Sequence, residues 1–307
     1  MGSMAQLALK VDEFRTRIIS PLIEMGAYEA LWLQPGASFK SIADKFRADK
    51  EAVPSDFVPK SLATETAHRV LDVMRADGVN GFGVRVHGAG EYPTKLRDAK
   101  HPIELLYYRG WWDLVDTRCV AIVGTRNPTE EGIGRTRRLV RQLVGDGFTI
   151  VSGLAKGIDS EAHRAAVDAG GKTIAVLGTP LNRTYPAENA DLQSRLAKDF
   201  LLISQVPVLK YLQAKNPRVN SYFFPERNVT MSALTLGTVI VEAGETSGAL
   251  YQARAAIEQG RKLFILDSCF NRRDLAWPAK YADRGAVRVA DYEDIRACLP
   301  LAEPSAA

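Results

Sequence analysis

The sequence predicts an α/β fold: a doubly wound, mainly parallel sheet preceded by a small helical N-terminal domain. Short runs rich in Val, Ile and Leu recur after residue 118 without polar alternation, which is typical of strands buried on both faces of a parallel sheet. Helical patterns separate these runs. The composition agrees with a globular domain, because 46% of the 307 residues are hydrophobic and 25% are charged.

A small helical module is predicted over residues 4–80. Apolar residues at steps of three and four predict an amphipathic helix over residues 7–25. Ser38 can cap a second, short helix, which a plain helical bundle explains better than a helix-turn-helix. A third helix is expected from about Ser61 to Ala76. Its inward face would be formed by Leu62, Thr66, Val70 and Val73.

The remaining boundaries follow from composition. Residues 1–3 are interpreted as a remnant of an expression vector. Glycines between Gly78 and Gly90 indicate a linker and lead-in to the core over residues 81–114, with a short strand. The core domain is predicted over residues 115–298 and a short tail over residues 299–307.

Strands and helices alternate in the core domain. The strands are expected at residues 119–123, 149–151, 173–177, 201–204, 238–241 and 263–266. The clearest helical patterns between them cover residues 133–144, 158–169 and 249–259.

The sequence also indicates the compartment and excludes some ligands. No apolar run approaches the roughly 18 residues of a membrane span, and no signal peptide is visible, so a cytoplasmic protein is expected. Cys119, Cys269 and Cys298 lack metal-ligand spacing, and no metal is expected. A net charge of +4 is compatible with an anionic partner.

The loops after the strands carry the candidate site, because ligands of such sheets bind beyond the carboxyl ends of the strands. Ser, Thr and Gly stand at several helix starts, where free N–H groups and the helix dipole attract phosphates. One cation follows each of the first four strands, and together these cations predict an anion-binding mouth. The predicted phosphate-binding residues are Gly124, Thr125, Arg126, Ser152, Gly153, Lys156, Arg183, Arg227, Asn228, Ser247 and Gly248.

Aromatic residues share this region. Tyr185 and Phe223 are candidates for base stacking, which contributes roughly 1–3 kcal/mol per base. A core position is an equally good interpretation of Phe223 and Phe224. Arg138, on the flank of a helix, is interpreted as part of a solvated face.

No catalytic constellation is expected. Asp159 and His163 share a helix face, but no nucleophile is placed with them, and the helix dipole explains an acidic residue in a first turn. Glu242 could act as a general base, yet it has no obvious partner. The glycine loops spell neither a dinucleotide-binding motif nor a P-loop, and no cofactor is expected.

In this order the loops resemble the DprA/Smf family of DNA-processing proteins. The resemblance rests on Val123–Arg126, Ser152–Asp159, Tyr185–Asn189, Phe224–Asn228 and Val241–Ala243. It implies an extended Rossmann-like fold that binds and protects single-stranded DNA without sequence preference, as a recombination mediator in DNA uptake and natural transformation. It further implies RecA as a partner, a homodimer, and phosphate contacts from Arg126, Lys156 and Arg227.

The resemblance has departures that make the chain a divergent member. Gln205 stands where the family usually has Glu, and Val229 stands where it usually has Arg. Two other interpretations remain open. One is a phosphoribohydrolase-like enzyme of the wider DprA/LOG superfamily, using Glu242 and the Ser247–Gly248 loop. The other is a sensor that binds a small nucleotide and signals through the helical module.

Overall fold

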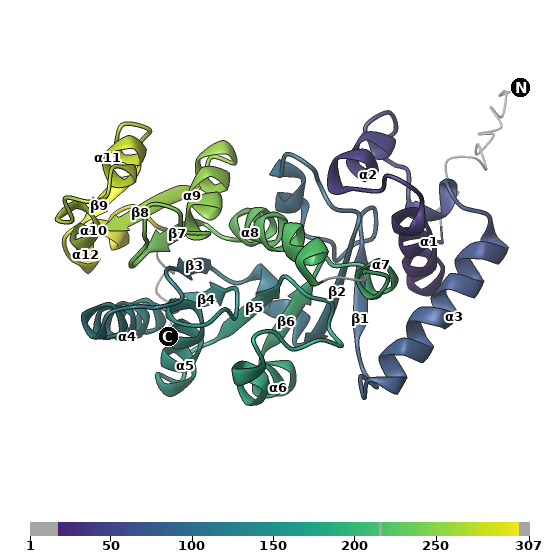
Figure 1. Ribbon diagram of the computed structural model, residues 1–307, viewed down its shortest axis with the longest axis horizontal. Helices are drawn as coiled ribbons and strands as arrows, with labels where there is room; N and C mark the ends of the chain where they lie inside the picture. The colour runs from purple at the N-terminus through teal and green to yellow at the C-terminus, as the bar shows by residue number, and fades with distance from the viewer. Residues whose placement is uncertain (1–17, 215–216, 301–307) are drawn as a thin grey trace, which may run out of the picture.

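The computed structural model describes residues 18–214 and 217–300 of the chain. The expected vector remnant, most of the helix expected over residues 7–25 and most of the tail lie outside the described residues. Within them, the strands form one nine-stranded sheet in the order β1-β2-β6-β5-β4-β3-β7-β8-β9 (Figure 1). The seven strands from β6 to β9 in this order are parallel, and β1 and β2 are antiparallel at one edge.

The six strands expected from the sequence are confirmed, with ends that differ by at most one residue. They are β3 (Cys119–Val123), β4 (Thr149–Ser152), β5 (Thr173–Leu177), β6 (Leu201–Ser204), β7 (Gly237–Ile240) and β8 (Lys262–Leu266). Almost every residue in them is buried, as strands covered on both faces require. A further strand, β9 (Val287–Val289), extends the sheet beyond β8.

Helices cover both faces of the sheet (Figure 1). One face carries α4 (Glu130–Gly145), α5 (Ile158–Asp168) and α6 (Ala190–Asp199), and the other carries α8 (Phe223–Leu234) and α9 (Ala249–Glu258). Alternate residues of β3 pack in different hydrophobic clusters. Val120 and Ile122 pack with α4, whereas Ala121 and Val123 belong to the larger core. The shorter helices are α7 (Val208–Leu212), α10 (Asp267–Phe270), α11 (Trp277–Ala282) and α12 (Tyr292–Arg296). The doubly wound prediction is therefore confirmed.

The segment expected as a linker and lead-in contributes two strands to the sheet. β1 (Gly83–Val86) pairs with β2 (Leu105–Gly110), and β2 pairs with β6. A short 3-10 helix, η3 (Thr94–Asp98), lies in the connection between them. This segment is thus an integral edge of the sheet.

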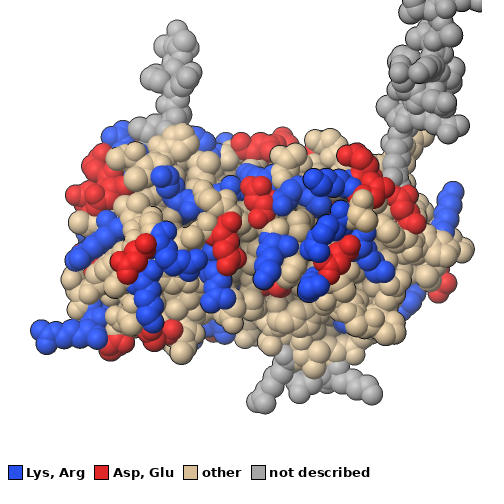
Figure 2. Space-filling view, turned by 90° about the horizontal axis from the view of Figure 1, so that it is seen from above, with Lys and Arg blue, Asp and Glu red and all other residues tan. Residues whose placement is uncertain are grey.

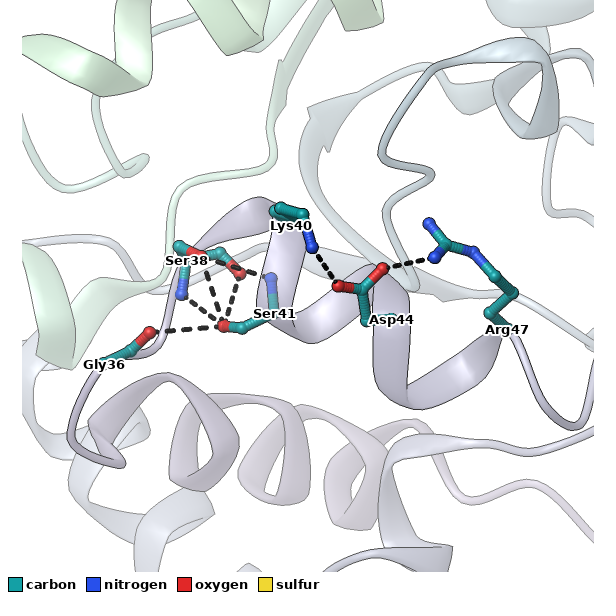
Figure 3. A network of polar contacts seen from close by, with 6 residues as sticks. All are labelled: Gly36, Ser38, Lys40, Ser41, Asp44 and Arg47. Carbon is teal, nitrogen blue, oxygen red and sulfur yellow. Dashed lines mark hydrogen bonds and ion pairs between the residues drawn. The ribbon is translucent and has the colours of Figure 1, made fainter.

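From residue 18 onward, the N-terminal module contains the α-helices α1 (Pro21–Leu33), α2 (Phe39–Phe46) and α3 (Lys60–Ala76). α1 begins at Pro21, since proline lacks an N–H and suits the first position of a helix, and it overlaps the helix predicted over residues 7–25 only at the end of that range. Ser38 caps α2 as expected, in a reciprocal capping box with Ser41 (Figure 3).

The predicted inward face of α3 is confirmed in part, because Thr66 and Val70 are buried. Leu62 is 43% exposed, and the face that packs on α1 is centred on Ala63 and Ala67. A Cβ atom at Gly26 of α1 would overlap the backbone oxygen of Ala63, so the two helices approach too closely for larger side chains between them.

Buried contacts join the N-terminal module to the sheet. The carboxylate of Glu29 accepts hydrogen bonds from Tyr107 Oη (2.5 Å) on β2 and from the backbone N–H groups of Val208 (2.6 Å) and Leu209 (3.0 Å). Burial raises the pKa of Glu29 to about 7. No helix in the described part of the chain is long and apolar enough to cross a membrane.

Candidate nucleic-acid interface

A pocket of about 540 Å³ opens between β3 and β7, where the connections of the sheet diverge in opposite directions. Open α/β sheets bind their ligands at such a switch point. The β3–α4 loop lines one side of this mouth pocket with residues 124–127, and the β7–α9 loop lines the other with residues 246–249. The first two turns of α8 supply Phe224, Arg227 and Asn228.

Asp159, in the first turn of α5, holds the loops of the mouth pocket together. Its buried carboxylate accepts a hydrogen bond from the N–H of Gly153 (3.1 Å) and further backbone hydrogen bonds from Ala155 and Gly124. Burial raises the pKa of this carboxyl, and the positive charge of Arg227 opposes that rise. Asp159 therefore fixes the ends of β3 and β4 relative to each other.

Arg227 has a different environment from the one the sequence suggested. Its side chain is buried, and Nη1 donates to the carbonyl oxygens of Gly153 (2.5 Å) and Val176 (2.7 Å). Nε donates to Asn228 Oδ1 (2.8 Å). A Cβ atom at Gly153 would overlap the guanidinium, so this position requires glycine. Arg227 borders the mouth pocket, but most of its hydrogen-bonding capacity is used inside the protein.

Arg126 is the exposed cation of the mouth pocket. Among the described residues its guanidinium has no hydrogen-bond or ion-pair partner. Arg126 also borders an adjoining pocket of about 510 Å³, together with Lys156 and Arg164. Lys156 is exposed, with Nζ 3.9 Å from Glu188 Oε1. The structure thus brings two of the predicted cations together at the surface and adds Arg164, which the sequence analysis did not select.

Arg183 lies apart from the other predicted cations. Its Nη1 atom is 3.2 Å from Asp77 Oδ1, at the end of α3, and also donates to the carbonyl of Asn182. Arg183 lines neither of the two pockets described above. The expected convergence of four cations is therefore found in part: two are exposed together, one is buried beneath them, and one faces the N-terminal module.

The predicted polar and glycine residues also fall into two groups, those that line the mouth pocket and those that are buried. Gly124, Thr125, Asn228, Ser247 and Gly248 line the mouth pocket. Asn228 Nδ2 donates to the carbonyl of Gly248 (3.1 Å), which ties α8 to the β7–α9 loop. Ser152, by contrast, is buried and donates its hydroxyl to the carbonyl of Ile122 (2.6 Å) on the neighbouring strand.

The base-stacking prediction for Phe223 is wrong, because the ring is fully buried among the rings of Trp32, Phe39 and Tyr222. The neighbouring residue, Phe224, lines the mouth pocket. Its partly buried ring lies 5.4 Å, centroid to centroid, from the ring of Tyr185, which is 50% exposed. A third ring, Tyr251 on α9, lines the mouth pocket and is 54% exposed.

The comparison with known proteins decides the family. Residues 83–300 match the family model for DNA recombination-mediator protein A. The DNA processing protein DprA of Bacillus subtilis is 34% identical over 233 residues, which cover 76% of this chain and 75% of that protein. The chain belongs to the DprA/Smf family.

Other relatives agree with this membership. The chain is 41% identical over 180 residues to protein Smf of Synechocystis, covering 57% of this chain but only 44% of that relative. The crystal structure of DprA from Streptococcus pneumoniae superposes with a TM-score of 0.66 at 27% identity, covering 91% of this chain and 98% of that one. A DprA structure from Helicobacter pylori, described for its single-stranded DNA binding mode, superposes with a TM-score of 0.57 at 27% identity.

Glu242 and His163 of this DprA/Smf chain are held in structural contacts. Glu242 accepts hydrogen bonds from the hydroxyl (2.8 Å) and the N–H (3.3 Å) of Thr129, the residue that caps α4. His163 is fully buried with Nδ1 2.7 Å from Thr173 Oγ1, and burial lowers its pKa to about 3. Within the described residues no three His, Cys, Asp or Glu side chains are grouped to hold a metal.

Proposed function

We propose that this chain binds single-stranded DNA through the mouth pocket, without sequence preference, and protects it as a recombination mediator. The observation that carries the proposal is the exposed guanidinium of Arg126, which has no partner among the described residues and stands beside Lys156 at the carboxyl edge of the sheet. Backbone phosphates are the groups that such cations bind in nucleic-acid complexes.

The aromatic side chains of the mouth support single strands over duplexes. The half-exposed ring of Tyr185 packs against the partly buried ring of Phe224, which lines the mouth pocket. An unpaired base can stack on such a ring, whereas a base inside a duplex cannot leave its stack without loss of pairing. Stacking and phosphate contacts do not involve the hydrogen-bonding edges of the bases, so little sequence dependence is expected.

Membership of the DprA/Smf family supports the same function. A relative from Helicobacter pylori is described for its binding of single-stranded DNA. We extend the proposal to a cytoplasmic homodimer that passes its DNA to RecA, as the family resemblance implies. Light scattering tests the dimer, which a monomer at micromolar concentration would contradict. Assembly of RecA on protein-coated single strands tests the transfer of DNA.

A binding role without turnover is part of the proposal. Asp159 is hydrogen-bonded to loop N–H groups, and Glu242 is hydrogen-bonded to Thr129, the cap of α4, so neither carboxylate is free to act as a base beside a nucleophile. The competing function is a nucleotide-binding sensor or hydrolase, which the volume of the mouth pocket, about 540 Å³, would also admit.

Competition binding separates these functions. A fluorescently labelled oligothymidylate is titrated with the protein, and unlabelled single strands, matched duplexes, ATP and nucleoside monophosphates then compete for it. The expected result is displacement by single strands and weak displacement by duplex or free nucleotides. Equal competition by a blunt duplex, or cleavage of a nucleotide that is lost in Glu242→Gln, would overturn the proposal.

A further inference from the structure

A second pocket rich in basic residues lies on the N-terminal side of the molecule. It has a volume of about 510 Å³ and opens between the end of α2 and the connection from β1 to β2. We call it the α2 groove. Its charged lining includes Arg47, Lys50, Arg97 and Lys100, with His87 and Glu51 also present.

Most carboxylates around the α2 groove are already neutralised. Asp44 is bracketed by Lys40 (2.6 Å) and Arg47 (2.7 Å), so this group of three carries a net positive charge (Figure 3). Beneath the groove, the buried carboxylate of Glu104 is held by Arg97 (2.8 Å) and by His87 (3.0 Å).

Two lysines of the α2 groove have no such partner. The side chains of Lys50 and Lys100 are exposed, and within the described residues neither makes an ion pair. The positive field reaches His101, whose pKa is lowered first by burial and then by Lys100, with Lys40 and Arg47 acting in the same direction. Figure 2 shows Lys and Arg side chains gathered on this face of the molecule.

The α2 groove is connected to the mouth pocket through α8. The short helix η3, which supplies Arg97, packs against α8. Lys100 acts electrostatically on Glu226, in the first turn of α8, and the residues on both sides of Glu226 line the mouth pocket. A chain of phosphates that leaves the mouth over this turn passes Glu226, whose charge is opposed by Lys100, and then reaches the basic residues of the α2 groove.

We propose that the α2 groove is a second phosphate-binding site, which holds the sugar–phosphate backbone of the single strand whose bases occupy the mouth pocket. This inference rests on the proposed function and adds a path for the strand across the N-terminal module. The groove offers charge without an exposed ring in its lining, so it binds backbone and reads no base.

The experiment compares a short oligothymidylate of about 5 nucleotides, which fills the mouth alone, with one of about 20 nucleotides, which exceeds the usual span of a single binding site. The test variant is Lys50→Ala with Lys100→Ala. The matched control is Lys172→Ala with Lys280→Ala, which removes two exposed lysines that line neither the mouth pocket nor the groove. Arg126→Ala serves as the mouth variant. Thermal unfolding verifies that each variant is folded.

The expected result is selective. The groove variant weakens binding of the long strand and flattens its log–log salt dependence by about 1.4, since each lost contact to a single strand removes about 0.7. It leaves the short strand unchanged, and the control leaves both unchanged. The proposed phosphate-binding role of the groove is overturned if the groove variant binds the long strand as tightly as the wild-type protein does. It is also overturned if the variant weakens binding of both strand lengths equally. Failure of the proposed function is distinct: the wild-type protein would then bind neither length, or bind the short strand independently of Arg126.

Discussion

Replacement of Arg227 by methionine tests whether this residue acts in folding or in direct binding. The substitution keeps an apolar stem of similar length and removes every donor. In the structure Nη1 donates to two buried carbonyl oxygens, those of Gly153 and Val176, and the guanidinium balances the charge of the buried Asp159. The substitution would leave both carbonyl oxygens without a donor and the Asp159 carboxylate without the opposing positive charge.

The magnitude follows from these contacts. Each buried acceptor that loses its partner costs about 1–3 kcal/mol, and leaving a buried charge without a compensating charge costs about 3–5 kcal/mol in total. The contributions overlap because all belong to one side chain, so we expect Arg227→Met to lower the free energy of unfolding by about 3–5 kcal/mol. The exposed Arg126 is the matched control, and Arg126→Ala should change this free energy by less than about 0.5 kcal/mol.

Urea unfolding followed by circular dichroism measures both variants. A midpoint for Arg227→Met close to that of the wild-type protein would refute the structural role. If such a stable variant also lost binding to single-stranded DNA, Arg227 would be a direct phosphate ligand, as the sequence analysis expected. If it were destabilised as predicted, its binding should recover at low temperature, where the folded state is populated.

Three further predictions concern the mouth and its surroundings. Arg126→Ala should weaken binding and flatten the log–log salt dependence by about 0.7, while Arg138→Ala on the flank of α4 should do neither; equal effects would place the DNA elsewhere. Tyr185→Ala should weaken single-strand binding by about 1–3 kcal/mol with an unchanged salt slope, and a changed slope would contradict a stacking role. Because the folded-state pKa of His163 lies near 3, below its ordinary value of 6.5, the free energy of unfolding should fall by about 2 kcal/mol as pH decreases from 7 to 5. His163→Asn should remove this part of the pH dependence in urea titrations, and an unaltered dependence would contradict it.

The buried parallel strands were the most predictable part of the fold. An unbroken apolar run such as Cys119–Val123 fits a strand covered on both faces, and the turn residues that follow it mark its end. The edge strands gave a weaker signal. β1 is four residues long and lies among glycines, so its composition is that of a loop, and only its pairing with β2 makes it part of the sheet.

The location of the candidate site was predictable from the sequence, but the solvent exposure of its side chains was less predictable. The cations after the strands mark the mouth, yet an arginine in a loop and an arginine folded inward have the same sequence signal. Arg126 and Arg227 differ only in what surrounds them in three dimensions. Phe223 and Phe224 are adjacent on α8, and helix geometry turns one into the core and the other toward Tyr185. Tyr251 was missed because it lies within a helix whose orientation the sequence does not reveal.

The burial of Arg227 explains how the mouth can remain both rigid and positively charged. Asp159 accepts hydrogen bonds from N–H groups of the loops after β3 and β4, and Arg227 donates to the carbonyl oxygens of Gly153, after β4, and Val176, on β5. A second exposed cation in place of this buried pair would leave the loops without internal support. Because the buried groups fix the loops, Arg126 needs no partner of its own and stays available to a phosphate. Stability and salt dependence should therefore respond to different residues: substitutions at Asp159 or Arg227 should appear mainly in unfolding, and substitutions at Arg126 or Lys156 mainly in the salt slope of binding.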